Sequence, residues 1–130
     1  MKSLRYILFF VLIVQRQFVQ AQDANNIIAK GNEAYKQQQY DKAIELYREA
    51  LKSSPGNPIA NFNLGNALFR NKKYDEAVKV FEEATQHESP GIAPGKIFYN
   101  KGVSFTAQKK LQESIDAYKQ ALRLNSTDSL

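Results

Sequence analysis

The strongest constraint on the fold is an internal repeat with a period of 34 residues. Sliding the chain against itself by 34 positions aligns identical or similar residues, and a further shift of 37 extends the alignment. Three units follow, at about 24–57, 58–91 and 95–128, and such a period indicates stacked copies of one supersecondary element. The identities include Gly31 with Gly65, Tyr40 with Tyr74, Ala43 with Ala77, Ala50 with Ala84, Gly65 with Gly102 and Ala84 with Ala121.

Each unit has the pattern of two helices joined by a short turn. In the first unit, apolar residues recur at helical spacing, stop at the polar run 36–39 and resume in a second stripe. Pro55-Gly56-Asn57 then ends the second helix, because a helix cannot easily continue through this sequence. Residues 88–95 contain two Pro and two Gly and are expected to form a loop between the second and third units.

Glycines occur at the same place in the first helix of every unit. A glycine inside a helix costs about 1 kcal/mol relative to alanine, so its repetition predicts a close approach of the backbone to another element. Large residues of the second helices are expected to fill the space beside them. The glycines are Gly31, Gly65 and Gly102, and the large residues are Tyr47, Phe81 and Tyr118.

This pattern resembles the tetratricopeptide repeat (TPR), and the resemblance covers essentially all of residues 22–130. It implies an all-α fold of helix-turn-helix repeats stacked as a short right-handed TPR superhelix. The chain departs from the family pattern locally, because Ile27, Asn61 and Phe98 stand where the family often has Trp. The positions that carry the resemblance are Gly65, Tyr74, Ala77, Phe81 and Ala84, repeated as Gly31, Tyr40, Ala43, Tyr47 and Ala50 and as Gly102, Leu111, Ser114, Tyr118 and Ala121.

The first 21 residues differ from the repeats. Lys2 and Arg5 precede the apolar run 6–14, and Val19 and Ala21 place small residues where a signal peptidase reads, so the order predicts a secretory signal peptide over 1–21 and a TPR domain over 22–130. Nine apolar residues make a helix of about 13 Å, under half of the hydrocarbon core of a membrane. Arg16 is atypical in a cleavage region and leaves an uncleaved anchor as the alternative. Membrane contact is expected only in that case.

The composition of the chain disfavours catalysis, metals and nucleic acid. There is no Cys, and His87 is the single histidine, so a thiol nucleophile, a zinc-thiolate site and a His-based metal cluster are absent from the sequence. Without the leader the chain carries 15 basic and 13 acidic side chains, a net charge of +2, which lacks the basic excess typical of nucleic-acid binding. We therefore expect no enzyme activity, no cofactor and no nucleic-acid partner.

The resemblance implies a concave groove, lined by the first helices, that holds a peptide or partner helix. Residues of these helices that lie off the packing stripe share one face, and they combine amides, aromatic rings and cations without any acid. Such a face fits an acidic or amphipathic protein segment. The candidate residues are Ile28, Asn32, Tyr35, Lys36, Phe62, Asn63, Asn66, Phe69, Arg70, Lys96, Tyr99, Asn100 and Val103.

Some TPR domains grip a chain-terminal carboxylate with a five-residue clamp of Lys, Asn, Asn, Lys and Arg. Asn32, Asn63 and Lys96 stand at three of these places, whereas Ile28 and Asn100 replace a Lys and the Arg. Two clamp cations are therefore missing, and a general groove is favoured over a terminal-carboxylate clamp.

The leader and the repeats together predict an exported, non-catalytic protein-interaction adaptor in a bacterial periplasm or envelope. The alternative is a non-catalytic fragment or subunit of a larger enzyme or of a cell-envelope assembly system. The leader followed closely by repeats with Gly31-Asn32, Phe62-Asn63 and Tyr99-Asn100 is also similar to small exported TPR proteins of bacterial aerotolerance (Bat) operons, which implies membrane partners with von Willebrand-type domains.

The last helix of the repeat array is expected to leave an apolar face open. In stacked repeats the second helix of each unit is covered by the next unit, and terminal units need a cover of their own. Here Ile115, Tyr118 and Leu122 lie on the final second helix. We expect self-association, a partner or further sequence to cover this face.

Overall fold

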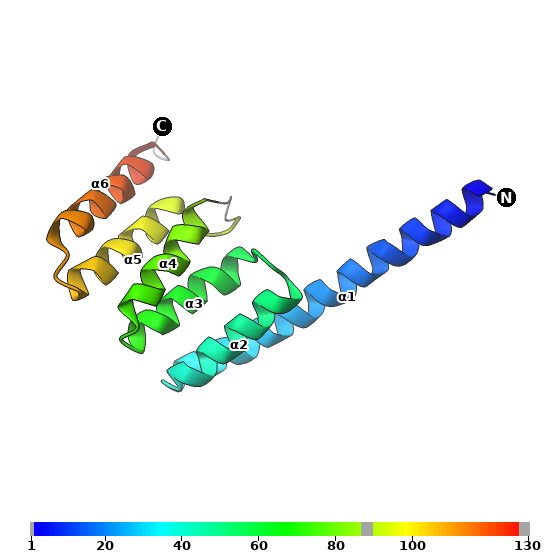
Figure 1. Cartoon of the computed structure of the whole chain (residues 1–130), viewed down its shortest axis with the longest axis horizontal. Helices are drawn as coiled ribbons and strands as arrows, with labels where there is room; N and C mark the ends of the chain where they lie inside the picture. The colour runs from blue at the N-terminus through cyan, green and yellow to red at the C-terminus, as the bar shows by residue number, and fades with distance from the viewer. Residues whose placement is uncertain (1, 87–89, 128–130) are drawn as a thin grey trace.

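The computed structural model describes residues 2–86 and 90–127, and α-helix is the only regular secondary structure over these ranges. His87 and the start of the expected 88–95 loop lie outside the described residues. The helices form three pairs, one in each repeat unit, which stack side by side (Figure 1). The all-α repeat prediction is confirmed. The six helices are α1 (Lys2–Lys36), α2 (Tyr40–Ser53), α3 (Pro58–Arg70), α4 (Tyr74–Thr85), α5 (Pro94–Ala107) and α6 (Leu111–Thr127).

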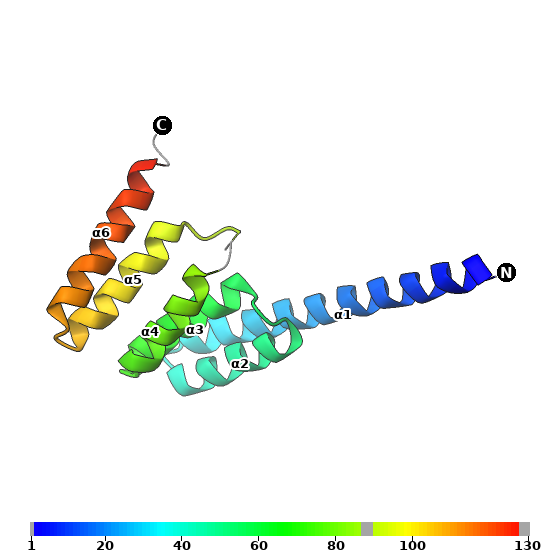
Figure 2. The same ribbon diagram turned by 45° about the horizontal axis from the view of Figure 1, so that its top comes forward.

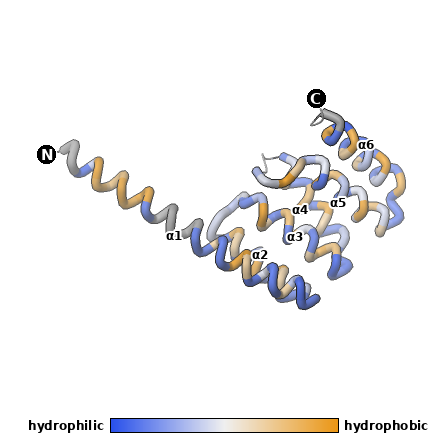
Figure 3. Tube along the Cα trace, turned by 180° about the vertical axis from the view of Figure 1, so that it is seen from behind, coloured by the Kyte–Doolittle hydropathy of each residue, from blue (hydrophilic) through white to orange (hydrophobic). Residues whose placement is uncertain are grey.

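The N-terminal part of α1 projects away from the repeats (Figures 1 and 2). Its apolar residues from Tyr6 to Val14 are exposed, and they appear as the hydrophobic stretch of the extension in Figure 3. The helix runs unbroken past residue 21, so the predicted cleavage site does not coincide with a structural boundary and stays a prediction. No helix within the described ranges is both long enough and apolar enough to cross a membrane.

Each helix pair is held together by an aromatic ring pressed against a glycine. A Cβ built on Gly65 would lie 2.5 Å from Cε1 of Phe81, and one on Gly31 would lie 2.6 Å from Cε1 of Tyr47. Gly102 has the same relation to Tyr118 in the third pair. The expected close approach is therefore present, and the residues beside the glycines are the predicted Tyr47, Phe81 and Tyr118, each with its ring against the backbone of the first helix in its own unit. These contacts leave no room for any side chain at the glycines.

Short turns with a left-handed residue close the three pairs. Gln38, Lys72 and Lys109 have φ of 60°, 61° and 60°, a conformation that favours glycine. In each turn the next amide donates back to the first helix, as from Lys73 N to Leu68 O at 2.9 Å. This hydrogen bond satisfies a carbonyl at the helix end, which offsets the strain of the left-handed residue.

Replacing the strained lysine with glycine should stabilise the chain. We expect Lys72→Gly to raise the free energy of unfolding by about 0.5–1 kcal/mol, because the left-handed penalty exceeds the extra chain entropy of glycine. Urea unfolding followed by circular dichroism measures this change. Lys79→Gly in the exposed middle of α4 is the control, and it should lower the same free energy by about 1 kcal/mol. A loss of stability in both variants would contradict the assigned turn.

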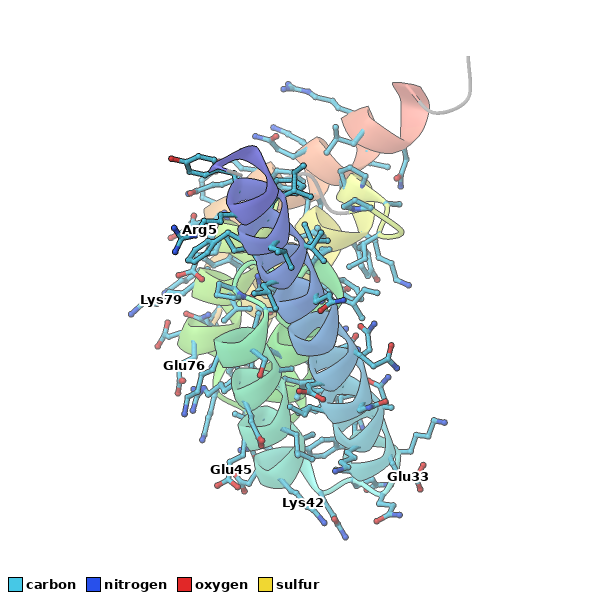
Figure 4. All side chains as sticks on the ribbon, turned by 90° about the vertical axis from the view of Figure 1, so that its right-hand side faces the viewer. Arg5, Glu33, Lys42, Glu45, Glu76 and Lys79 are labelled. Carbon is cyan, nitrogen blue, oxygen red and sulfur yellow. The ribbon has the colours of Figure 1, made fainter. Side chains whose placement is uncertain are left out.

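Caps and exposed ion pairs complete the stack. Asn57 caps α3 by accepting from the amide of Ala60 at 3.0 Å, while Pro94 begins α5, so the last two residues of the expected 88–95 loop are helical. Arg48 pairs with Glu76 across units at 2.7 Å, and Figure 4 shows Glu76 and Lys79 pointing outward from α4. Such exposed pairs contribute little, so apolar packing between neighbouring helices supplies most of the stability.

Candidate functional site

Three hollows follow one another along the first helices of the units. The hollow of about 470 Å³ between α1 and α3 shares Tyr35 and Asn66 with a hollow of about 240 Å³ between α3 and α5. The latter shares Tyr99 with a third hollow of about 510 Å³ between α5 and α6. Because neighbouring hollows share lining residues, they form one continuous surface, which we call the groove.

A row of asparagines crosses the groove from unit to unit. Asn63 donates through Nδ2 to Oδ1 of Asn32 at 2.9 Å, and Asn100 donates through Nδ2 to Oδ1 of Asn66 at 2.8 Å. The hydroxyl of Tyr47 also donates to Oδ1 of Asn32, at 2.7 Å. These bonds orient the amides and leave the remaining amide donors and acceptors directed at the groove, where they can pair with the backbone of a bound segment.

The hydroxyl of Tyr47 positions Asn32, the first asparagine of the row, through a hydrogen bond. Burial, and secondarily the Coulombic effect of Tyr35, raise the pKa of Tyr47 to about 12. The hydroxyl therefore stays protonated at physiological pH and remains a hydrogen-bond donor to Asn32. Sequence reasoning assigned Tyr47 to packing alone and missed this positioning role, because helical spacing places the ring but not the hydroxyl.

Three cations lie along the groove. Two of them contact aromatic rings, and the third is exposed to solvent. Arg70 lies over the ring of Tyr40, 5.3 Å from its centroid, and donates to the Tyr40 hydroxyl at 2.7 Å. Lys96 lies 5.5 Å from the ring centroid of Phe62. Lys36 is exposed at the end of α1. The ring contacts hold Arg70 and Lys96 in place while leaving their charges available to a ligand.

No carboxylate balances these cations within the groove. None of the residues that line the three hollows is acidic, whereas Glu82, Glu113 and Asp116 line a fourth hollow that shares no residue with them. The ion pairs among the described residues use four other cations, namely Arg48, Lys73, Lys101 and Lys110. The groove therefore carries uncompensated positive charge, which favours an acidic ligand.

The predicted groove residues divide into two groups. Two of them are buried in the core, which corrects the expectation that they lie off the packing stripe: Ile28 is 5% exposed and Phe62 is 8% exposed. Both belong to the core cluster; the ring of Phe62 packs against Phe81 of α4 at a centroid distance of 6.2 Å and lies under Lys96 of α5. The others keep at least part of their surface, namely Asn32, Tyr35, Lys36, Asn63, Asn66, Phe69, Arg70, Lys96, Tyr99, Asn100 and Val103.

The five positions that correspond to the carboxylate clamp do not form one in this chain. Ile28 is buried and apolar where a lysine would be needed. Asn100 is engaged with Asn66 and carries no charge where an arginine would be needed. Within the described residues there is also no group of three or more His, Cys, Asp or Glu side chains able to hold a metal ion. The geometry thus provides amides, aromatic rings and cations for binding.

The chain belongs to the tetratricopeptide repeat family, because models of this repeat match residues 28–96 and 95–128. These two ranges cover all three helix pairs from Ile28 onward. No protein of curated function matches the sequence.

Solved TPR structures have the same arrangement. The first TPR domain of Spaghetti (RPAP3), bound to the HSP90 peptide SRMEEVD, is 31% identical with a TM-score of 0.72, and the match covers 80% of each chain. The second TPR domain of Spaghetti, bound to the same peptide, is 27% identical with a TM-score of 0.74 over 85% of this chain and 98% of that one. The N-terminal domain of stress-induced protein-1 from C. elegans is 25% identical with a TM-score of 0.74 over 81% and 86%.

Proposed function

We propose that this chain is a non-catalytic adaptor that binds an acidic segment of another protein in the groove. The observation that carries the proposal is the set of cations at Lys36, Arg70 and Lys96, which no lining carboxylate neutralises. The asparagine row supplies hydrogen-bond groups for the backbone of the segment. The similar Spaghetti domains are bound to SRMEEVD, a peptide with three acidic side chains, which supports an acidic ligand for this groove.

The proposed ligand is an internal acidic segment rather than a chain terminus. A terminal-carboxylate clamp needs cations that Ile28 and Asn100 do not provide. The remaining cations are spread over three units and can meet side-chain carboxylates along an extended chain.

Three synthetic peptides test this proposal by isothermal calorimetry. SRMEEVD is the acidic probe, its C-terminal amide removes only the terminal charge, and SRMQQVN removes only the side-chain charges. We expect the amide to bind within about threefold of SRMEEVD, and SRMQQVN to bind at least about tenfold more weakly. Loss of binding on amidation would show a terminal clamp instead. Failure of all three to bind would contradict an acidic ligand.

We also propose export to a bacterial periplasm or envelope, with removal of residues 1–21. The basic start, the apolar run 6–14 and the small residues before Gln22 support this proposal. We further propose that the exported chain works in an aerotolerance complex, beside membrane partners with von Willebrand-type domains. We expect the intact mass of the protein recovered from an envelope fraction to correspond to a chain that begins at Gln22. A full-length mass in the membrane pellet would favour the uncleaved anchor.

A further inference from the structure

The hollow between α3 and α5 is the repeat of the hollow between α1 and α3. A shift of 34 residues, or of 37 into the third unit, carries every residue that lines the first hollow onto a residue that lines the second. The two hollows therefore occupy the same place in successive pairs of units, and the differences between their linings indicate what each can bind. Three positions keep their chemistry, namely Asn32 with Asn66, Asn63 with Asn100 and Lys36 with Arg70.

The other three positions lose a polar group in the second hollow. Tyr35, Tyr47 and Asn66 of the first hollow become Phe69, Phe81 and Val103 in the second. Tyr47 directs its hydroxyl at Asn32, whereas Phe81, which is 1% exposed, closes the floor of the second hollow with a bare ring. A polar side chain buried against Phe81 and Val103 would lose its hydration without gaining a hydrogen bond from either of them. This floor therefore favours an apolar side chain.

The second hollow has room for one large side chain. Its volume is about 240 Å³, and an apolar cavity of about 150 Å³ is enough to hold a benzene molecule. Tyr35 and Tyr99 contribute further rings to the lining. The amides of Asn66 and Asn100 bond to each other at 2.8 Å, so they meet part of their own hydrogen-bonding need. An aliphatic or aromatic side chain would bury most of its surface here.

The helices on both sides of this hollow define its shape. It lies between the first helices of two stacked units. The hollow of about 510 Å³ differs, because it borders the expected open apolar face of α6, where Ile115 is 45% exposed and Leu122 is 69% exposed. Among the described helices, α6 packs against α5 alone. The hollow between α3 and α5 is therefore the better-defined pocket for a ligand side chain.

Arg70 places an acidic residue beside this pocket. Its guanidinium lines the hollow and is held by Tyr40, with Cζ 5.3 Å from the ring centroid and a hydrogen bond of 2.7 Å to the hydroxyl. An extended segment rises about 3.3 Å per residue, so a residue one or two positions from a carboxylate at Arg70 reaches the hollow. The cation and the pocket can thus read neighbouring residues of one segment.

We infer that the hollow between α3 and α5 is a specificity pocket for one large apolar side chain, which the bound segment carries one or two residues from the acidic residue that meets Arg70. The inference rests on the proposed function, since it concerns the same groove and the same acidic segment. It adds that charge alone does not select the partner.

Exchanging the changed residues for those of the first hollow tests the inference by isothermal calorimetry. The probes are SRMEEVD and SRSEESD, in which serines replace Met and Val while every charge remains. We expect the wild-type chain to prefer SRMEEVD at least about tenfold. The triple variant Phe69→Tyr, Phe81→Tyr and Val103→Asn should reduce this preference to within about threefold, because the floor then offers polar groups.

The variants come with controls for folding and for place. Each substitution introduces the residue that the preceding unit carries at the same position, and circular dichroism checks that the helices remain. If the triple variant does not fold, Val103→Asn alone should lower the preference at least about threefold. Phe105→Tyr adds a hydroxyl to a ring that lines the separate fourth hollow, and it should keep the full preference.

Three results would overturn the inference. Equal affinities of the wild-type chain for SRMEEVD and SRSEESD, with SRMQQVN still at least about tenfold weaker, would remove the pocket but leave the proposed function standing. A full preference in the folded triple variant would place the apolar side chain elsewhere, such as in the hollow of about 510 Å³. Failure of SRMEEVD to bind would remove the proposed function and this inference together.

Discussion

Gly65→Leu should unfold the domain more severely than any surface change. A Cβ at this position would already lie 2.5 Å from Phe81, and leucine adds three more carbons in the same direction. Phe81 is 1% exposed and packs against Phe62 at a centroid distance of 6.2 Å, so its ring has no free space into which to move. We expect a loss of at least about 3 kcal/mol in the free energy of unfolding, or roughly 12–20 °C in melting temperature.

A double variant separates this steric clash from a loss of helix propensity. Phe81→Ala alone should cost about 3–5 kcal/mol through the cavity it leaves, but Gly65→Leu with Phe81→Ala should cost clearly less than the sum of the two. Lys72→Ala, on an exposed turn, is the control and should be nearly neutral. Additive losses in the double variant, or equal melting temperatures for Gly65→Leu and Lys72→Ala, would contradict the ring-on-glycine contact.

The repeat period explains why the helix pairs and this contact could be predicted. A position that recurs at the same place in three units has the same neighbours in each, so Gly31, Gly65 and Gly102 had to meet a common feature. The sequence assigned Tyr47, Phe81 and Tyr118 of the same units to the space beside these glycines, and the ring-on-glycine contacts confirm that prediction. Helical spacing places Tyr47 and Phe81 on the inner stripe but does not say how deep their rings reach.

The turns were predicted in position but not in conformation. Left-handed residues are usually recognised from glycine, whereas Gln38, Lys72 and Lys109 have ordinary side chains. The conformation follows from the packing of the two helices, which sets where the chain must reverse and which carbonyl the next amide reaches. That constraint is tertiary and leaves no local signal in the sequence.

The groove could be predicted only as a set of helix faces. Ile28 and Phe62 share a face with Asn32 and Asn63, but the stacking of units buries the first two and leaves the asparagines half-exposed. The bonds from Asn63 to Asn32 and from Asn100 to Asn66 join residues of different units. Such pairing depends on the rotation from one unit to the next, which periodicity within a unit does not specify.

The groove charges should control binding of an acidic segment with little effect on the fold. Arg70 and Lys96 are exposed, and neither takes part in the ion pairs of the described residues. We expect Arg70→Glu or Lys96→Glu to weaken SRMEEVD binding about tenfold each, and the double variant about a hundredfold, because each change replaces an attraction with a repulsion inside a partly enclosed surface. Calorimetry measures the affinities, and circular dichroism checks that the helices remain.

Salt and a distant cation provide the controls for this last expectation. The affinity of the wild-type chain for SRMEEVD should fall steeply between low salt and 1 M, where the screening length is about 3 Å. Lys79→Glu makes the same charge reversal on the outer surface of α4 and should leave the affinity within about twofold. If binding were instead independent of salt and of Arg70 and Lys96, the attraction would have to come from the apolar side chains of the groove. In that case Tyr99→Ala, which removes an exposed ring shared by two of the hollows, should abolish binding while the charge reversals do not.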